Sequence, residues 1–205
     1  MILVQARSTS SRFPRKHLAP LCGSTALDIL ISRIRGVAPF AFLIPLGDDL
    51  MSEELFKRDV LIFSGPEHDV LGRYAAAMAN WNLDWCIRIT GDCPLISPQD
   101  ISWMVNVCTA SRFDYGSNFG QVQTDGMEVE YLSRRLVHWL DVHTIAMREH
   151  VTMAAREQRK FLEINGYSFY DAPVQYGWHG AGKLSIDTPE DLERVEMVMR
   201  KMGAI

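Results

Sequence analysis

Strand-like apolar runs alternate with amphipathic stretches along the first half of the chain. A stretch after the first run places Leu27, Leu30 and Ile34 at helical spacing, which predicts a helix that starts near Thr25. Alternating strands and helices are typical of an α/β domain with a mainly parallel sheet. The strand-like runs are residues 1–4, 40–45, 60–63 and 84–89.

The second half continues this alternation less regularly. Ser133 predicts the start of one helix, and a second is expected from near Arg148. Thr188 and Pro189 open a last helix, because a capping hydroxyl before proline is typical of a helix start. We therefore expect one three-layer α/β domain over residues 1–205. Strands are expected at residues 113–118, 126–132, near 184 and, with loop, within 161–176.

Polar and cationic residues follow the first apolar run at once. Arg7, Ser10, Arg12 and Lys16 lie in one short loop, which Pro14 prevents from forming a regular element. Ligands of open α/β sheets bind beyond the carboxyl ends of the strands. Guanidinium, ammonium and hydroxyl groups all donate to phosphate oxygens. The loop therefore predicts an anion site, and the alternative is an ordinary solvated basic loop.

Two aspartates stand where strands are expected to end. Asp92 follows residues 84–89 in a turn shaped by Gly91 and Pro94, and Asp187 directly precedes Thr188. Each aspartate also fits a structural role in a turn or a helix cap. The residues alone leave both interpretations open.

Composition restricts the classes of partner. The chain has 205 residues and a formal net charge of −4, which gives no reason to expect nucleic-acid binding. Its four cysteines show no paired spacing, which indicates reduced thiols and a cytoplasmic protein. The first apolar run is too short for a signal sequence or a membrane span, so we expect no membrane insertion.

Several motifs together resemble one family. The first loop, QARSTSSRFPRKHLAPLCG, is similar to the N-terminal signature of the SpsF-type cytidylyltransferases, relatives of the CMP-KDO and CMP-sialate synthetases. The chain departs from that signature at Thr9 and Arg15, where the family has glycine. Arg15 puts a cation there, and we expect it to supply anchoring that the family obtains from backbone amides. The resemblance continues, in the family's order, through FSGPEHDVLGRY, RITGDCPLI, DYGSN, DGMEVE, REHVT and SIDTPEDL.

This resemblance implies the nucleotide-diphospho-sugar transferase fold. It also implies a Mg²⁺-dependent nucleotidyltransferase that joins CMP from CTP to a sugar-like acceptor and releases pyrophosphate, for surface polysaccharide or glycoconjugate biosynthesis. Mg²⁺ prefers oxygen ligands. The implied metal ligands are Asp92 and Asp187, and the implied catalytic residues are these two with Arg7, Arg12 and Lys16.

The resemblance also divides the remaining site residues between two substrates. The implied partners are CTP and a small sugar-like molecule. A segment at about 113–180 is expected to bind the acceptor and to join two copies into a homodimer. The implied nucleotide-binding residues are Arg7, Ser10, Arg12, Lys16, Asp69 and Arg73. The implied acceptor-binding residues are Asp125, Glu128, Glu130, Arg148, Glu149 and His150.

Simpler interpretations remain beside these roles. Asp69 and Arg73, four residues apart, also fit a surface ion pair worth only ~0.3–0.5 kcal/mol. Glu128 and Glu130 also fit the polar face of an alternating strand. Two rival functions are a non-catalytic nucleotide-binding or scaffold protein, which the substituted glycines favour, and a glycosyltransferase. The second would need a DxD-like metal motif, which Cys93 and Pro94 after Asp92 disfavour.

Overall fold

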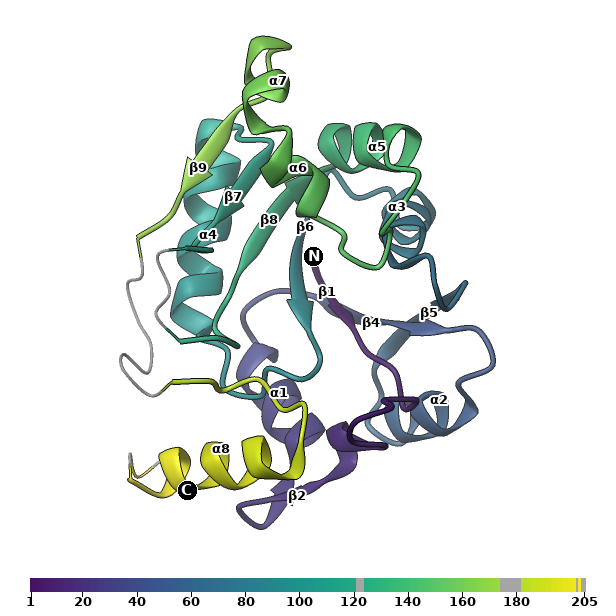
Figure 1. The fold of residues 1–205 in the computed structure, drawn as a ribbon, viewed down its shortest axis with the longest axis vertical. Coiled ribbons are helices and arrows are strands. Elements are labelled where there is room, and N and C mark those ends of the chain that lie inside the picture. Colours follow the sequence, from purple (N-terminus) through teal and green to yellow (C-terminus); the bar gives the residue numbers. More distant parts are fainter. Residues whose placement is uncertain (121–123, 174–181, 202, 204–205) are drawn as a thin grey trace.

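A seven-stranded sheet runs through the protein, with helices packed on both of its faces (Figure 1). This computed structural model describes residues 1–120, 124–173, 182–201 and 203. The strand order is β5-β4-β1-β6-β8-β7-β9. The strands are β1 (Ile2–Gln5), β4 (Phe40–Pro45), β5 (Leu61–Gly65), β6 (Trp85–Thr90), β7 (Tyr115–Ser117), β8 (Glu130–Ser133) and β9 (Phe169–Asp171), with a separate hairpin of β2 (Pro20–Leu21) and β3 (Ser24–Thr25). The helices are η1 (Lys16–Leu18), α1 (Ala26–Ile34), α2 (Asp49–Phe56), α3 (Val70–Asn80), α4 (Pro98–Ser111), α5 (Arg134–His143), α6 (Met153–Glu157), α7 (Arg159–Ile164) and α8 (Pro189–Lys201).

The alternation of side chains along the central strands makes the three layers. In β1, Ile2 and Val4 pack with α1, α2 and α4 on one face, while Leu3 packs with α3 and α5 on the other. Successive side chains of a strand point to opposite faces, so an all-apolar strand must be covered on both sides. This confirms the predicted three-layer α/β fold.

Parallel pairing brings the carboxyl ends of three strands to one edge. β1 pairs in parallel with β4 and with β6, and Gln5 lies opposite Thr90 in the second pair. β8 is antiparallel to both β6 and β7, whereas β9 is parallel to β7. The sheet is therefore mainly parallel, and the loops after β1 and β6 start side by side.

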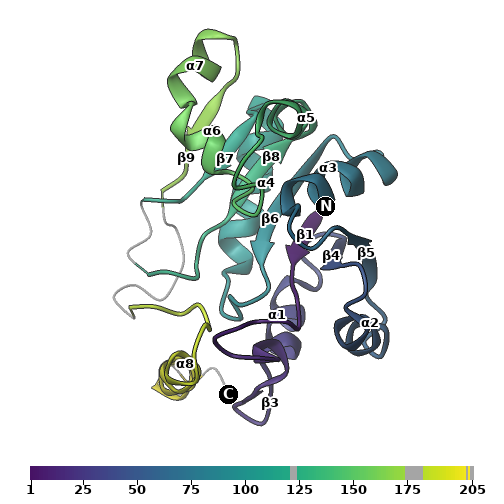
Figure 2. The same ribbon diagram turned by 45° about the vertical axis from the view of Figure 1, so that its right-hand side comes forward.

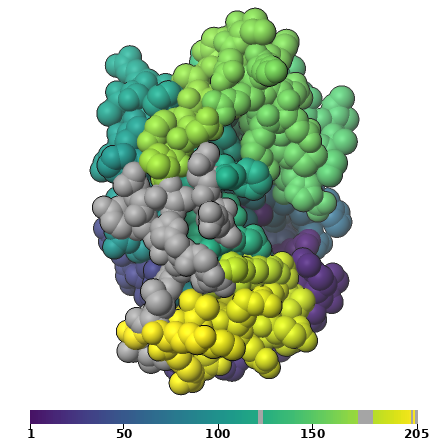
Figure 3. All heavy atoms as spheres, turned by 60° about the vertical axis from the view of Figure 1, so that its left-hand side comes forward, coloured from purple at the N-terminus to yellow at the C-terminus, as the bar shows by residue number. Residues whose placement is uncertain are grey.

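The last helix closes one end of the molecule. Val195 and Met199 of α8 pack in a third apolar cluster with Leu21, Ala26 and Ile186. Figures 1 and 2 show α1, β3 and α8 together at this end. The packing brings the segment before α8 next to the first loop, and Figure 3 shows C-terminal residues beside N-terminal ones there.

Helix caps follow the sequence closely. The side chains of Thr25, Ser97 and Ser133 each accept a backbone N–H at the starts of α1, α4 and α5. Thr188 accepts the N–H of Asp191 at the start of α8. The helix starts predicted at Thr25, Ser133 and Thr188 are confirmed.

Several predicted elements of the second half are wrong. Residues 126–129 are not strand, and β8 begins at Glu130. The helix expected from Arg148 begins at Met153. Residues 161–164 end helix α7 instead of forming strand or loop, whereas β9 supplies the strand expected within 161–176. The segment around Leu184 belongs to no strand. Part of the predicted 161–176 segment lies outside the described residues. Within the described residues, no helix combines the length and apolar character needed to cross a bilayer.

Candidate active site

A cleft of about 330 Å³ opens at the carboxyl ends of β1 and β6. It lies at the edge where ligands of open α/β sheets bind. Nine of the residues predicted from sequence line it, so the structure brings together most of the expected nucleotide and metal site. These nine are Arg7, Ser10, Arg12, Lys16, Arg73, Asp92, Glu149, His150 and Asp187.

Gly91 allows the loops after β1 and β6 to touch. Its N–H donates to the carbonyl of Gln5 at 2.8 Å. A Cβ at this position would lie 3.0 Å from Ala6 Cβ, Gln5 O and His17 Nε2. A larger residue would force at least one of these neighbours to shift, so glycine here permits the close approach of the two loops.

A buried carboxylate shapes the first loop. Asp48 caps α2 by accepting the N–H of Met51 at 3.2 Å. The same carboxylate accepts from Ser8 N at 2.7 Å and from Ser8 Oγ at 2.5 Å. Three hydrogen bonds to a buried charge hold the loop against α2. The sequence analysis did not assign Asp48 a role.

Thr9 and Arg15, which replace two glycines of the family signature in the first loop, differ in backbone conformation. Arg15 has φ 58° and ψ 26°, the left-handed conformation that glycine adopts without steric cost. Thr9 is not among the described residues with positive φ. Arg15 is exposed and does not line the cleft, so the structure does not support the phosphate-anchoring role expected for it.

Lys16 joins the two predicted metal ligands. Its Nζ donates to Asp92 Oδ2 at 2.7 Å and to Asp187 Oδ1 at 3.0 Å. Arg12 Nη2 also donates to Asp187 Oδ1 at 3.0 Å, and Lys183 Nζ to Asp187 Oδ2 at 3.0 Å. The carboxylates, 95 residues apart in the sequence, therefore meet around one ammonium group.

The surrounding cations keep both carboxylates charged. Burial alone would raise the pKa of Asp92, but the ammonium of Lys16 outweighs it and holds this pKa below its usual range. Burial likewise opposes the shift at Asp187, where hydrogen bonds from Lys16 and Lys183 lower the pKa. Two ionised carboxylates facing one cation fit the oxygen ligands that a divalent metal ion requires.

Arg73 lies buried along the same cleft. Its side chain packs beside Gly65, where a Cβ would meet Arg73 Cγ at 2.7 Å, and the residue is 3% exposed. Its Nε and Nη1 have no hydrogen-bond partner within the described residues. Burial lowers the pKa of this guanidinium. A buried donor without a partner costs free energy, so a ligand that accepts from Arg73 would remove a penalty.

Asp69 and Arg148 contact each other instead of the cleft. Arg148 Nε and Nη2 donate to the two oxygens of Asp69 at 2.8 and 3.1 Å, and Nη1 donates to the carbonyls of Asp141 and Thr144. Asp69 also caps α3 by accepting the N–H of Gly72 at 2.8 Å. The pair suggested between Asp69 and Arg73 is not formed. Asp69 and Arg148 thus connect α3 to the end of α5.

Glu130 lies inside the sheet. It is 1% exposed, forms ion pairs with Arg88 and Arg156, and accepts from the hydroxyl of Tyr115. Both carboxylate oxygens of Glu130 accept hydrogen bonds from these residues. Glu130 does not line the cleft. Burial would raise its pKa, but Arg88 and the other donors keep this pKa low. The structure therefore corrects the prediction that Glu130 offers a free carboxylate to a substrate.

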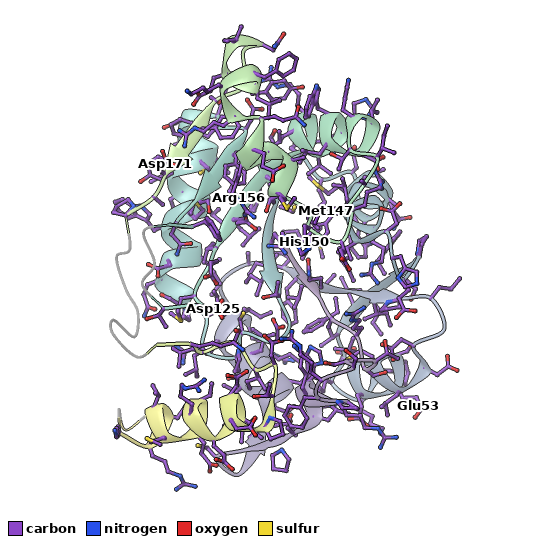
Figure 4. The ribbon with its side chains drawn as sticks, in the orientation of Figure 1. Glu53, Asp125, Met147, His150, Arg156 and Asp171 are labelled. Atoms are coloured by element: carbon purple, nitrogen blue, oxygen red, sulfur yellow. The ribbon has the colours of Figure 1, made fainter. Side chains whose placement is uncertain are left out.

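The other predicted acceptor residues lie in two places. Glu149 and His150 line the cleft, with 3.8 Å between His150 Nε2 and Glu149 Oε1. Asp125 accepts from Ser185 Oγ at 2.6 Å, and Glu128 from Gly126 N at 2.9 Å. Figure 4 shows His150 in the middle of the molecule and Asp125 near the chain that leads into α8. Neither Asp125 nor Glu128 lines the described cleft.

Three further cleft residues received no role in the sequence analysis. Glu67 accepts from Thr9 Oγ1 at 3.1 Å. Arg88 Nε donates to Gln5 Oε1 at 3.2 Å. Burial lowers the pKa of His17 to about 4, and its Nδ1 has no partner in the described chain. No local sequence pattern distinguishes His17 from a packing residue.

The family model for cytidylyltransferases matches residues 1–204. The chain belongs to the cytidylyltransferase family. Its agreement with that family covers the first loop, the Asp92 turn and the Asp187 segment, which together form the cleft described above.

Two curated relatives and one solved structure extend this match. The spore coat polysaccharide biosynthesis protein SpsF of Bacillus subtilis is 27% identical over 219 residues, covering 99% of this chain and 87% of the relative. A 3-deoxy-manno-octulosonate cytidylyltransferase of Cytophaga hutchinsonii is 26% identical over 249 residues, covering 94% of each. A cytidylyltransferase from Leptospira borgpetersenii superimposes with a TM-score of 0.87 at 28% identity, over 98% of this chain and 86% of that one.

Proposed function

We propose that the protein transfers a cytidylyl group from CTP to a sugar-like acceptor and releases pyrophosphate, with Mg²⁺ as cofactor. The observation that carries the proposal is the meeting of Asp92 and Asp187 beneath a loop of cations. The names of the SpsF and octulosonate relatives support a role in making a polysaccharide or a related glycoconjugate.

The transfer requires no covalent intermediate with the protein. An acceptor oxygen forms a bond to the α-phosphorus of CTP, the bond from that phosphorus to the β-phosphate bridging oxygen breaks, and pyrophosphate leaves with that electron pair. Arg7, Arg12 and Ser10 donate to the phosphate oxygens and orient them for in-line attack. Asp92 and Asp187 would hold Mg²⁺, which when bound would supply further positive charge at the phosphates.

The far end of the cleft would hold the rest of the nucleotide. Arg73 donates from its buried guanidinium to the base or ribose, which satisfies nitrogens that have no hydrogen-bond partner among the described residues. Arg88 is held by Glu130 and Gln5 at the boundary between β1 and β6. Asp69, Glu130 and Arg148 support these groups from outside the cleft.

The acceptor would enter from the side of the second half. His150 and Glu149 line that side of the cleft and would orient or deprotonate the attacking hydroxyl. Asp125 and Glu128 belong to the proposed acceptor-binding and dimerisation segment, at about 113–180. We also propose that two copies of the chain associate through this segment.

Calorimetric titration and a pyrophosphate-release assay test the function together. CTP with Mg²⁺ should bind more tightly than UTP or ATP. Asp92→Asn and Asp187→Asn should each lose at least about 100-fold in turnover, because each removes a metal ligand. Asp84→Asn is the matched control, since Asp84 precedes β6 at its other end and is almost fully exposed. Absence of any nucleotide binding would refute the proposal and favour the scaffold alternative.

A further inference from the structure

The ammonium group of Lys16 lies between the carboxylates of Asp92 and Asp187. A metal ion bound by both carboxylates would need the same position. Lys16 is 8% exposed, and its Nζ contacts both Asp92 Oδ2 and Asp187 Oδ1. No other cationic side chain in the described residues is bonded to both carboxylates. Of these two carboxylates, Arg12 and Lys183 contact only that of Asp187, and both cations are more exposed than Lys16.

A divalent ion and this ammonium group compete for the same oxygens. Magnesium sits about 2.0–2.1 Å from its oxygen ligands. Lys16 Nζ lies 2.7 and 3.0 Å from one oxygen of each carboxylate, so an ion bridging those oxygens would face a positive nitrogen at close range. Repulsion between the two cations in a buried site disfavours their coexistence.

We propose that Lys16 is the resident counter-ion of the metal site, and that it must leave Asp92 and Asp187 before a divalent ion binds there. This inference rests on the metal role given above to the two aspartates. The phosphates of the incoming nucleotide give the ammonium a new anionic partner. The four-carbon stem of lysine allows this movement without a change in the backbone.

The consequence is a positive coupling between metal and nucleotide. A divalent ion that binds alone has to displace the ammonium group of Lys16 and leave it buried without an anionic partner. The divalent ion alone therefore binds weakly. With the triphosphate present, Lys16 moves to the phosphates and the ion takes its place on the carboxylates. Each ligand therefore raises the affinity for the other by the same factor.

Manganese titration without nucleotide, followed by electron paramagnetic resonance, tests the counter-ion role. Lys16→Met should bind Mn²⁺ on the order of tenfold more tightly than the wild type. Lys16→Arg keeps the positive charge and should retain weak binding. Lys57→Met, which removes an exposed lysine paired with Glu54, is the matched control and should change nothing. Lys16→Gln provides a second neutral variant if the methionine variant does not fold.

Coupling is measured by repeating each titration with CTP present. CTP should raise Mn²⁺ affinity at least about tenfold in the wild type and much less in the neutral Lys16 variants. Equal or weaker Mn²⁺ binding by those variants in the absence of CTP would overturn the counter-ion role. If the wild type nevertheless binds Mn²⁺ with CTP, and does so through Asp92 and Asp187, the proposed function stands. If the wild type binds no CTP, the proposed function itself fails.

Discussion

At the scale of single residues, Arg15 carries backbone strain that the family's glycine avoids. The left-handed backbone conformation of an L-residue such as Arg15 costs roughly 1–2 kcal/mol of stability. Glycine would remove this cost, but it would also increase the conformational entropy of the unfolded chain, so the net gain is smaller. We predict that Arg15→Gly raises the free energy of unfolding by about 0.5–1 kcal/mol and leaves CTP affinity unchanged. Urea unfolding and calorimetry measure the two effects.

Arg35→Gly is the control for this prediction. Arg35 is also exposed but has φ −63°, so glycine relieves no strain there and should destabilise the protein. Weaker CTP binding by Arg15→Gly would contradict the structure and restore the phosphate-anchoring role expected from the sequence.

His17 should make stability depend on pH. Its pKa is about 4 in the folded protein and 6.5 unfolded, so the unfolded state binds more protons between these values. Stability is therefore complete above pH 6.5 and falls as the pH is lowered toward 4, with a loss of about 2 kcal/mol between pH 7 and 5. Asp92 and Asp187, whose pKa values are lowered, lose their contribution as the pH falls from about 3.8 toward their folded pKa values, so they barely change stability between pH 7 and 5.

Urea unfolding at pH 7 and pH 5 measures this dependence. His17→Gln should flatten it, because glutamine carries no proton to exchange. His138→Gln, at an exposed position on α5, should leave the wild-type slope intact. An unchanged slope in His17→Gln would show that another group is responsible.

The sequence predicted residues of the site that lie in recognised motifs. Lys16, Asp92 and Asp187 are in such motifs, and the structure brings them into contact. Asp92 also follows the end of strand β6 closely. It could not predict that Asp69 pairs with Arg148, because a spacing of 79 residues leaves no local pattern. Asp48 was missed for the same reason.

At the scale of elements, prediction succeeded where periodicity was long and capped. Helix α1 buries the predicted face of Leu27, Leu30 and Ile34. It failed for α7, a helix of six residues with a single buried side chain, Leu162. The apolar residues Phe161 and Ile164 suggested a strand, but both lie exposed on the surface of α7. Short elements depend on tertiary contacts that the sequence does not display.

Strand β8 depends on a buried ion cluster. Glu130 is paired with Arg88 and Arg156, and removing one partner of a buried pair leaves uncompensated charge at a cost of about 3–5 kcal/mol. We predict that Glu130→Gln lowers the free energy of unfolding by an amount in this range, measured by urea unfolding.

Glu163→Gln is the matched control for the buried cluster. Glu163 also pairs with an arginine, Arg159, but both side chains are substantially exposed. Exposed pairs contribute about 0–1 kcal/mol, so this variant should remain close to the wild type. A Glu130→Gln variant as stable as Glu163→Gln would mean that β8 does not need the cluster.

At the scale of the whole molecule, β6 divides the sheet between two proposed tasks. Strands β1, β4 and β5 lie on one side of it and carry the nucleotide end of the cleft. Strands β8, β7 and β9 lie on the other side, with α6 and α7 beside them (Figure 1). The family resemblance predicted this division, but it gave no information on how the second half presents its surface.

That surface supports the predicted homodimer. Ile145 is 93% exposed, Ile164 85% and Phe161 53%, and all three belong to the proposed dimerisation segment. Trp139 of α5 lies 6.2 Å from Phe161 of α7, measured between ring centroids, so apolar side chains of two helices are neighbours here. Phe161 and Ile164 belong to the same short helix, α7. Large exposed apolar groups that lie together on a surface are typical of protein interfaces.

Light scattering at micromolar concentration should therefore give about twice the mass of one chain. Ile164→Glu should shift the protein toward monomer, because a buried unpaired carboxylate opposes association. Phe56→Glu is the matched control, since Phe56 is 82% exposed on α2 in the first half and should leave the assembly intact. A wild-type protein that stays monomeric at high micromolar concentration would refute the dimer. Dissociation by Phe56→Glu alone would instead place the interface on the nucleotide half, away from the acceptor side of the cleft.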